Sequence, residues 1–315
     1  MRLDRMRRSS NVEDARGQRA GGGGLGGLGG LGGEGGRGGL KLGLGGIVLA
    51  LIASWLLGID PRVALGVVQG GAAVAGAADS SGAGMPDMGS AAGGSSGAMG
   101  APTDAAGDAA AAVLGDTEET WGGIFKAGGA QYKPPVLKLF SGEVVTACGR
   151  ANSGAGPFYC PGDQKVYIDL SFWKELETQF EAAGDFAQAY VIAHEVGHHI
   201  QTITGISKQV REAQARANKA QQNQLQVMME LQADCYAGIW AHHAERSRQI
   251  LEQGDIEEAL AAASAVGDDT IQKRMQGYVQ PESFTHGTAQ QRMQWFKRGL
   301  ETGSMQSCDT FKGGA

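Results

Sequence analysis

The chain has 315 residues, of which 53 are glycine, and a formal net charge of −6 at pH 7. This acidic excess gives no reason to expect a nucleic-acid partner. The length would allow two domains, but glycine is concentrated in the first third, so we expect one folded domain after a long tether.

Residues 42–59 contain no charged residue and include the apolar run from Ile47 to Leu57. A stretch of roughly 18 such residues is just long enough to cross a bilayer core. Positive charge marks the cytoplasmic side of a membrane, and here it precedes the stretch, at Arg2, Arg5, Arg7, Arg8, Arg16, Arg19, Arg37 and Lys41. We therefore predict a cytoplasmic segment at 1–41, a transmembrane signal anchor at 42–59 and a periplasmic or otherwise extracytoplasmic C-terminal domain. A cleaved signal peptide is the alternative.

Residues 60–115 are rich in Gly, Ala and Ser and lack the periodic large apolar residues that repay backbone ordering. They predict a flexible linker. All six histidines and all four cysteines follow this stretch. The chemistry of the protein is therefore expected in a single domain at 116–315.

The pattern within this domain predicts the α+β class. Residues 141–168 have the character of two or more strands, and helical patterns dominate after them. We expect a small antiparallel sheet packed on a helical core. The run Lys165 to Ile168 is a candidate sheet edge to which an extended peptide could add.

An even number of cysteines on the exported side of a membrane suits two disulfides. Cys148 and Cys160 flank a glycine-rich loop between extended runs, where a bridge would close a hairpin. A second bridge, between Cys235 and Cys308, would pin the C-terminal tail to a helix. Zinc ligation by cysteine is the alternative, although no C-x-x-C spacing is present.

The run at 194–198 reads H-E-x-x-H within uncharged neighbours that indicate a buried helix. Positions i and i+4 of a helix lie on one face, so His194 and His198 present their imidazoles to one point. Two neutral imidazoles held in this way form half of a tetrahedral zinc site. Glu195 lies one step round the helix, where it can reach a metal-bound water. Gln201 and Thr204 stand where a metzincin has its glycine and third histidine, which excludes that class.

A third ligand is expected from a later helix. Glu230 and Asp234 are also four residues apart and have apolar or small neighbours. Two carboxylates on a buried face are costly without a cation, and a zinc ion would remove that cost. We assign Glu230 as a zinc ligand and Asp234 as the acceptor of a hydrogen bond from a ligand histidine. The alternative is that both are solvated charges on a helix surface.

With these motifs the chain resembles the putative neutral zinc metallopeptidases, bacterial single-pass membrane proteins with a gluzincin-like H-E-x-x-H and E-x-x-x-D arrangement. The resemblance covers most of the chain, from Met1 to Phe311. It is carried by the metal motifs and by residues 9–17, 184–190, 265–269, 284–292 and 308–311. It implies a zincin core beside the small sheet, with zinc as the cofactor and a peptide or protein as the substrate.

The resemblance also extends to His286. The segment from Thr285 to Arg292 is similar to one that follows the glutamate helix in other membrane gluzincins, which implies that His286 stabilises charge on the substrate carbonyl. Local hydrogen bonding within a loop explains this histidine equally well. Asp268 and Asp269 either orient ligands or cap a helix.

The predicted function is that of a membrane-anchored zinc endopeptidase acting on exported or envelope proteins. Glu195 would assist attack of a zinc-bound water on the peptide bond. The alternative is a metal-stabilised binding or scaffold module of the cell envelope with little or no turnover. The presence of Glu195 favours the enzyme, because a module that only holds metal does not need it.

Overall fold

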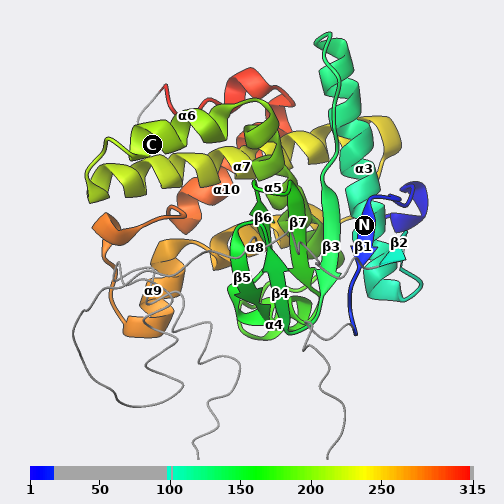
Figure 1. The fold of residues 1–315 in the computed structure, drawn as a ribbon, viewed down its shortest axis with the longest axis horizontal. Coiled ribbons are helices and arrows are strands. Elements are labelled where there is room, and N and C mark those ends of the chain that lie inside the picture. Colours follow the sequence, from blue (N-terminus) through cyan, green and yellow to red (C-terminus); the bar gives the residue numbers. More distant parts are fainter. Residues whose placement is uncertain (18–97, 101, 313–315) are drawn as a thin grey trace, which may run out of the picture. The chain divides into compact units, whose positions relative to one another are not determined.

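A five-stranded sheet and the helices around it make up the described part of the chain, residues 1–17, 98–100 and 102–312 of a computed structural model (Figure 1). The strand order is β2-β1-β3-β7-β6. Leu137 and Leu139 of β3 pair with Val166 and Ile168 of β7, and all four side chains are fully buried. The strands are β1 (Val12–Asp14), β2 (Ala98–Met99), β3 (Val136–Phe140), β6 (Phe158–Cys160) and β7 (Lys165–Asp169).

The sheet is mixed, and the prediction of an antiparallel sheet is wrong. Strands β1, β3 and β7 are parallel, while the outer strands β2 and β6 run antiparallel to their neighbours. Between β3 and β7 the chain forms a separate hairpin, β4 (Glu143–Thr146) and β5 (Gly149–Asn152), and then β6. Because β7 lies between β3 and β6, residues 165–168 are not a sheet edge. Strand β6 takes that place.

Helices account for most of the rest of this unit. In Figure 1 the long helix α7 crosses above the strands, with α10 beside it. The helices are α3 (Ala105–Ala127), α4 (Phe172–Thr178), α5 (Asp185–Ile203), α6 (Ile206–Gln214), α7 (Lys219–Arg248), α8 (Asp255–Ala265), α9 (Asp268–Gln276) and α10 (Ala289–Thr302), with short 3₁₀ turns η1 (Leu3–Arg5), η2 (Ser153–Ala155), η3 (Pro281–Ser283) and η4 (Met305–Cys308).

The first 17 residues belong to the same compact unit as residues 98–312. The Arg2 amide donates to the Ile250 carbonyl at 2.8 Å, the Ser9 amide donates to the Ala111 carbonyl at 2.9 Å, and β1 pairs with β3. A single membrane crossing between these two parts would place them on opposite sides of the bilayer. These contacts therefore contradict the predicted single-pass topology.

The predicted transmembrane helix itself, residues 42–59, lies outside the described residues. In the described ranges no helix has both the length and the apolar character needed to cross a membrane. The predictions of a membrane-spanning helix and of a single-pass membrane localisation are accordingly corrected. The charge pattern was misleading because basic residues of the first 17 form ion pairs within the fold, such as Arg8 with Asp108 and Arg16 with Asp14.

Helix α3 begins at Ala105, inside the stretch that was expected to be linker. Its alanines 110–112 are buried, and Asp104 caps its first turn by accepting the amide of Gly107 at 3.0 Å. A Cβ at Gly115 would lie 2.4 Å from the Arg7 carbonyl oxygen, so the N-terminal segment touches the helix backbone. The small residues of helix α3 let neighbouring segments pack closely against it. Composition alone does not distinguish such a helix from a flexible linker.

Two glycines bring α7 and α10 into backbone contact. A Cβ at Gly238 would lie 2.1 Å from the Phe296 carbonyl oxygen, and a Cβ at Gly299 would lie 1.9 Å from the Cys235 carbonyl oxygen. Both distances are far below van der Waals contact with atoms of rigid backbone. The glycines therefore set the depth at which α10 packs on the helix that carries Glu230.

Replacing Gly299 by Ala should lower the free energy of unfolding by about 3 kcal/mol, because the added methyl group forces the two helices apart. Chemical denaturation measures this change. Gly123→Ala is the control, since a Cβ there meets nothing within 4 Å, and it should stabilise helix α3 by up to about 1 kcal/mol. Equal stabilities of the two variants would contradict the close packing.

Candidate active site

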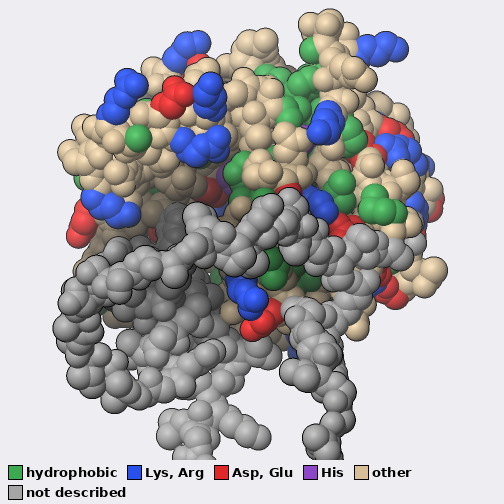
Figure 2. All heavy atoms as spheres, viewed as in Figure 1, with side chains coloured by type: hydrophobic (Ala, Val, Ile, Leu, Met, Phe, Trp, Pro, Cys, Tyr) green, Lys and Arg blue, Asp and Glu red, His purple; other side chains and the backbone are tan. Residues whose placement is uncertain are grey.

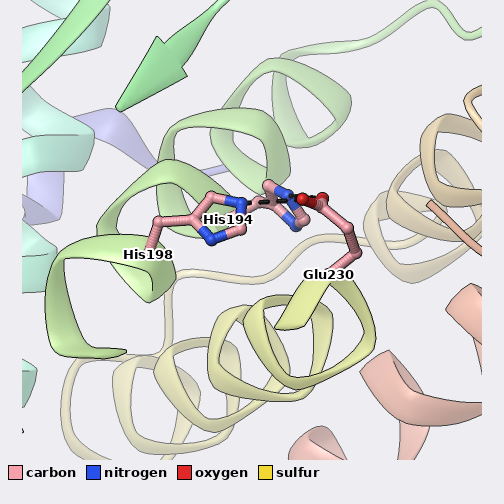
Figure 3. Close-up of side chains that lie close together, drawn as sticks. All are labelled: His194, His198 and Glu230. Carbon is pink, nitrogen blue, oxygen red and sulfur yellow. Dashed lines mark hydrogen bonds and ion pairs between the residues drawn. The ribbon is translucent and has the colours of Figure 1, made fainter. Parts of the chain in front are cut away.

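Helices α5 and α7 bring the H-E-x-x-H and E-x-x-x-D sequences together. They pack closely where a Cβ at Gly197 would lie 3.0 Å from Ala233. One ligand atom each from His194, His198 and Glu230 lies within 4.8 Å of the other two, and Figure 3 shows the three side chains pointing toward one another. The structure thus places the three predicted zinc ligands in one cluster that can hold a metal ion.

The distances within this cluster suit a tetrahedral ion. Zinc bonds of about 2.0–2.1 Å require donor atoms about 3.3–3.4 Å apart. The Glu230 Oε2 atom lies 3.2 Å from His194 Nε2 and 3.6 Å from His198 Nε2. Two imidazoles and one carboxylate are also a donor set found in catalytic zinc sites.

The cluster is largely shielded from solvent. His194 and Glu230 are each 7% exposed, and histidine forms only a small area of the surface in Figure 2. Burial by itself would raise the pKa of Glu230, but the charge of His198 and the hydrogen bond with His194 hold that pKa well below its usual value. In the metal-free site Glu230 therefore stays ionised beside the two histidines.

Asp234 lies where the sequence predicted it, against a ligand histidine. His194 Nδ1 donates to Asp234 Oδ1 at 2.8 Å, which turns Nε2 toward Glu230 Oε2, 3.2 Å away within the metal-binding group. The same carboxylate accepts the Tyr190 hydroxyl at 2.5 Å and both Nε and an NH2 group of Arg292, at 2.8 and 2.9 Å. Arg292 in turn donates to the Val266 carbonyl at 3.3 Å. Asp234 is fully buried, and these hydrogen bonds, together with the positive charge of Arg292, stabilise its carboxylate.

Two glutamines hold the other donors, and neither was predicted to do so. His198 Nδ1 donates to Gln201 Oε1 at 2.9 Å, and the Gln226 amide donates to Glu230 Oε1 at 2.9 Å. Gln201 is fully buried. Gln201 follows His198 by three residues and Gln226 precedes Glu230 by four, so each glutamine lies on the same helix face as its ligand. This spacing is the only signal in the sequence that could have identified them.

Glu195 follows His194 on α5 and is 8% exposed. Burial raises the pKa of its carboxyl above the usual glutamate value, against the charges of His198 and His194. A basic carboxylate beside a metal site is suited to accept a proton from water.

His286 lies in the loop between η3 and α10. Its Nδ1 atom is 3.2 Å from Asp268 Oδ1, and its side chain is 45% exposed. The Asp268 Oδ2 atom accepts the backbone amides of Thr285, His286 and Gly287 at 2.6–3.0 Å. Asp268 therefore fixes this loop, and its neighbour Asp269 accepts the amide of Ala289 at 2.7 Å.

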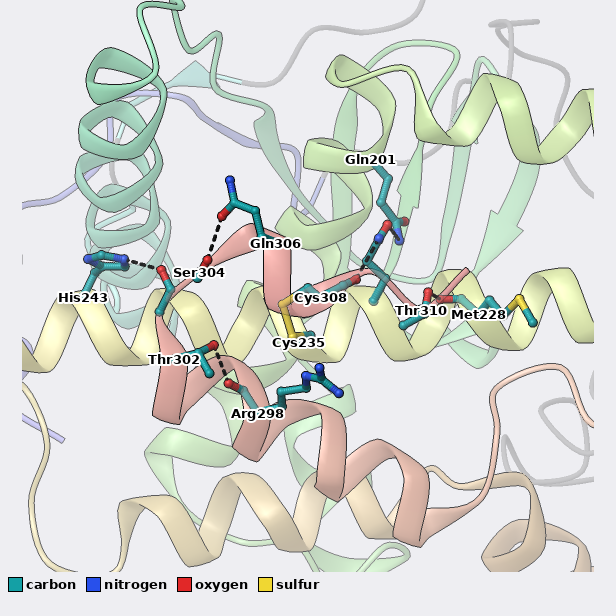
Figure 4. The surroundings of a disulfide bond; sticks show 12 residues. Gln201, Met228, Cys235, His243, Arg298, Thr302, Ser304, Gln306, Cys308 and Thr310 are labelled. Atoms are coloured by element: carbon teal, nitrogen blue, oxygen red, sulfur yellow. Dashed lines mark hydrogen bonds between the residues drawn. A yellow bond between two sulfur atoms is a disulfide. The ribbon is translucent and has the colours of Figure 1, made fainter. Parts of the chain in front are cut away.

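The four cysteines form two disulfides, Cys148–Cys160 and Cys235–Cys308, with Cα–Cα distances of 5.8 and 5.7 Å. Both predicted bridges are confirmed. None of these sulfurs is part of the metal-binding group at His194, His198 and Glu230. The second bridge joins η4 to the middle of α7 (Figure 4).

Comparison with known proteins gives one family and several relatives. The family described as "Putative neutral zinc metallopeptidase" matches residues 1–311. The Uncharacterized protein YpfJ of Escherichia coli (strain K12) is 53% identical over 199 residues, which are 63% of this chain and 69% of that protein. The Uncharacterized protein Rv2575 of Mycobacterium tuberculosis is 47% identical over 191 residues, 57% of this chain and 63% of that protein. No solved structure gives a significant match.

The family match takes in nearly the whole chain, including both metal motifs. The family's description names zinc, and His194, His198 and Glu230 form a group that could hold a metal ion. The chain therefore belongs to the putative neutral zinc metallopeptidases, the family that its sequence motifs indicated.

Proposed function

We propose that the protein is a zinc-dependent peptidase that hydrolyses peptide bonds with Glu195 as general base. The observation that carries this proposal is the convergence of His194, His198 and Glu230, with a buried carboxylate at the next position of the same helix. Three donors leave a fourth position of a tetrahedral ion open, as in catalytic rather than structural zinc sites.

His194, His198 and Glu230 would hold the zinc ion, which would supply Lewis-acid chemistry toward water and the peptide carbonyl. Glu195 accepts the proton that the attacking water loses and passes it to the leaving amine. His286 donates a hydrogen bond to the carbonyl oxygen as that oxygen gains charge. The contact of its Nδ1 atom with Asp268 leaves Nε2 of this half-exposed ring for the substrate.

The charges of the site support a divalent cation. Glu195, Glu230 and Asp234 are three buried carboxylates, and Arg292 is a buried cation that pairs with Asp234. A zinc ion brings two further positive charges, so that the carboxylates are balanced. Buried charges without such balance would be strongly destabilising.

Strand β6 is the sheet edge nearest to the metal helix and is the place where we propose that an extended substrate pairs. Among the described residues it is the last strand of the sheet on that side. Its Tyr159 hydroxyl lies 3.1 Å from His199 Nδ1 on α5, so the edge is tied directly to the helix that carries the motif.

Removal of the metal tests the proposal. The full chain should cleave an unfolded protein such as reduced casein, lose this activity on dialysis against a zinc chelator and regain it with zinc but not with magnesium, because imidazole donors disfavour magnesium. Proteolysis that persists in the metal-free protein would contradict the zinc mechanism. Protein that binds zinc but cleaves no peptide would instead indicate the binding or scaffold module.

A further inference from the structure

A buried chain of hydrogen bonds joins the second histidine of the metal site to the C-terminal tail. His198 Nδ1 contacts Gln201 Oε1 at 2.9 Å, Gln201 Nε2 donates to Gln232 Oε1 at 3.2 Å, and Gln232 Nε2 donates to the Cys308 carbonyl at 2.9 Å. Gln201 and Gln232 are at most 3% exposed. Figure 4 shows Gln201 and the Cys235–Cys308 bridge around this chain.

Backbone carbonyls fix the direction of every bond in this chain, because a carbonyl can only accept. The Cys308 carbonyl requires the NH2 group of Gln232, so the oxygen of Gln232 must face Gln201. The Met229 carbonyl, 2.7 Å from Gln201 Nε2, requires the NH2 group of Gln201. The oxygen of Gln201 must then face His198.

An amide oxygen facing His198 Nδ1 accepts a hydrogen bond only if that nitrogen carries the proton. The neutral imidazole then has its lone pair on Nε2. This is the nitrogen that lies 3.6 Å from Glu230 Oε2 in the metal cluster. The Met229 carbonyl, with Gln232 and the Cys308 carbonyl behind the same NH2 group of Gln201, thus selects the form of His198 that can bind a metal.

The Cys308 carbonyl is itself held in place by covalent and polar contacts. Cys308 is bonded to Cys235 and is fully buried, and the Thr310 hydroxyl donates to the Met228 carbonyl at 2.7 Å. The two histidines therefore depend on different supports. His194 is oriented by the charged carboxylate of Asp234, whereas His198 is oriented by a neutral relay that ends at the disulfide-bonded tail.

We propose that Gln201 is a positioning residue for His198, that the Met229 carbonyl fixes its direction, and that Gln232 and the Cys235–Cys308 disulfide help to hold it there, and thereby raise the zinc affinity. This inference rests on the proposed zinc site. It makes the C-terminal tail, far from the metal motifs in sequence, a determinant of metal binding.

The first test uses zinc affinity, measured by competition with a chromophoric chelator. Gln201→Met, which keeps the side-chain volume but has no acceptor for His198, should weaken zinc binding by about 10- to 100-fold, the usual effect of losing a partner of a ligand. Gln188→Met on the same helix is the control and should leave the affinity unchanged. An unchanged affinity in Gln201→Met would overturn the proposal.

The second test separates the two disulfides. Cys235→Ala/Cys308→Ala should weaken zinc binding, whereas Cys148→Ala/Cys160→Ala, which also removes one bridge, should not. Should the first double variant fail to fold, Gln232→Leu keeps the bridge and breaks the link to the tail. It should weaken zinc binding less than Gln201→Met does, because the Met229 carbonyl still holds Gln201. Equal affinities of Gln232→Leu and the wild type would overturn the relay.

The third test measures which ring nitrogen of each histidine carries the proton in the metal-free protein. Nitrogen NMR of the ring at alkaline pH should show His198 with the proton on Nδ1 in the wild type and a mixture of both forms in Gln201→Met. Gln232→Leu should show a smaller fraction of the second form, because the Met229 carbonyl still orients Gln201. His194 should be unchanged in both, because Asp234 orients it. A general structural defect would alter both histidines, which would overturn the assignment. If the wild type binds no zinc, the proposed function fails, while this readout still decides the role of Gln201.

Discussion

Replacing Glu195 by Gln is expected to lower kcat for peptide hydrolysis by about 10²- to 10⁴-fold, the usual contribution of a general base. The amide has nearly the same shape as the carboxylate but cannot take a proton from water. Glu195 is not one of the three clustered donors, so the variant should retain its zinc. Steady-state kinetics and metal analysis of the same preparation measure both quantities.

The matched control is Glu212→Gln on α6, where the side chain is 59% exposed and its Lys208 partner is 4.0 Å away. This variant should have wild-type activity and metal content. Residual activity close to wild type in Glu195→Gln would mean that another group accepts the proton. Loss of zinc from that variant would mean that Glu195 helps to hold the metal, contrary to the assignment.

Replacing Glu230 by Ala should remove zinc binding almost completely and with it all hydrolysis. The variant loses one of the three metal donors, and the only anionic one among them. Its loss of zinc affinity should therefore exceed the roughly 10- to 100-fold weakening that follows removal of a residue hydrogen-bonded to a ligand. Zinc at about a thousandfold excess over its Kd should stabilise the wild type by roughly 4 kcal/mol. Thermal unfolding with and without zinc should therefore show a rise in Tm for the wild type and none for the variant.

Glu212→Ala is the control for this experiment, and its Tm should respond to zinc as that of the wild type does. A zinc-dependent rise in Tm that survives in Glu230→Ala would show that a different group completes the site. The three-donor assignment would then be incorrect, even though the histidines lie as the structure describes them.

Local periodicity was enough to identify the candidate metal site. His194 and His198, and likewise Glu230 and Asp234, are spaced at i and i+4, and any helix places such residues on one face. The structure brings all four together at the predicted positions. The presence of two disulfides followed from the even number of cysteines, and the loop between Cys148 and Cys160 favoured the pairing that the structure shows.

Composition was a poor guide to the first third of the chain. Basic residues before an apolar stretch indicated a cytoplasmic segment, yet residues 1–17 pack in the same unit as residues 98–312. Ala-rich residues after 104 indicated a linker, yet they begin helix α3. In each case the residues pack against partners more than a hundred positions away in the sequence, such as Leu137 opposite Val12. Patterns of neighbouring residues do not identify such distant partners.

The sequence by itself indicated the family and predicted the candidate donor set, because the donors stand at short spacings within two helices and the family motifs cover most of the chain. The role of Glu195 as general base stays a prediction. Only the tertiary structure decided the direction of the sheet, the place of the N-terminal segment and the supports of the metal ligands. Arg292 reaches Asp234 from α10, and Gln232 reaches the Cys308 carbonyl from α7. These contacts join residues 58 and 76 positions apart, and their partners are fixed by how helices pack, which spacing along a single helix does not specify.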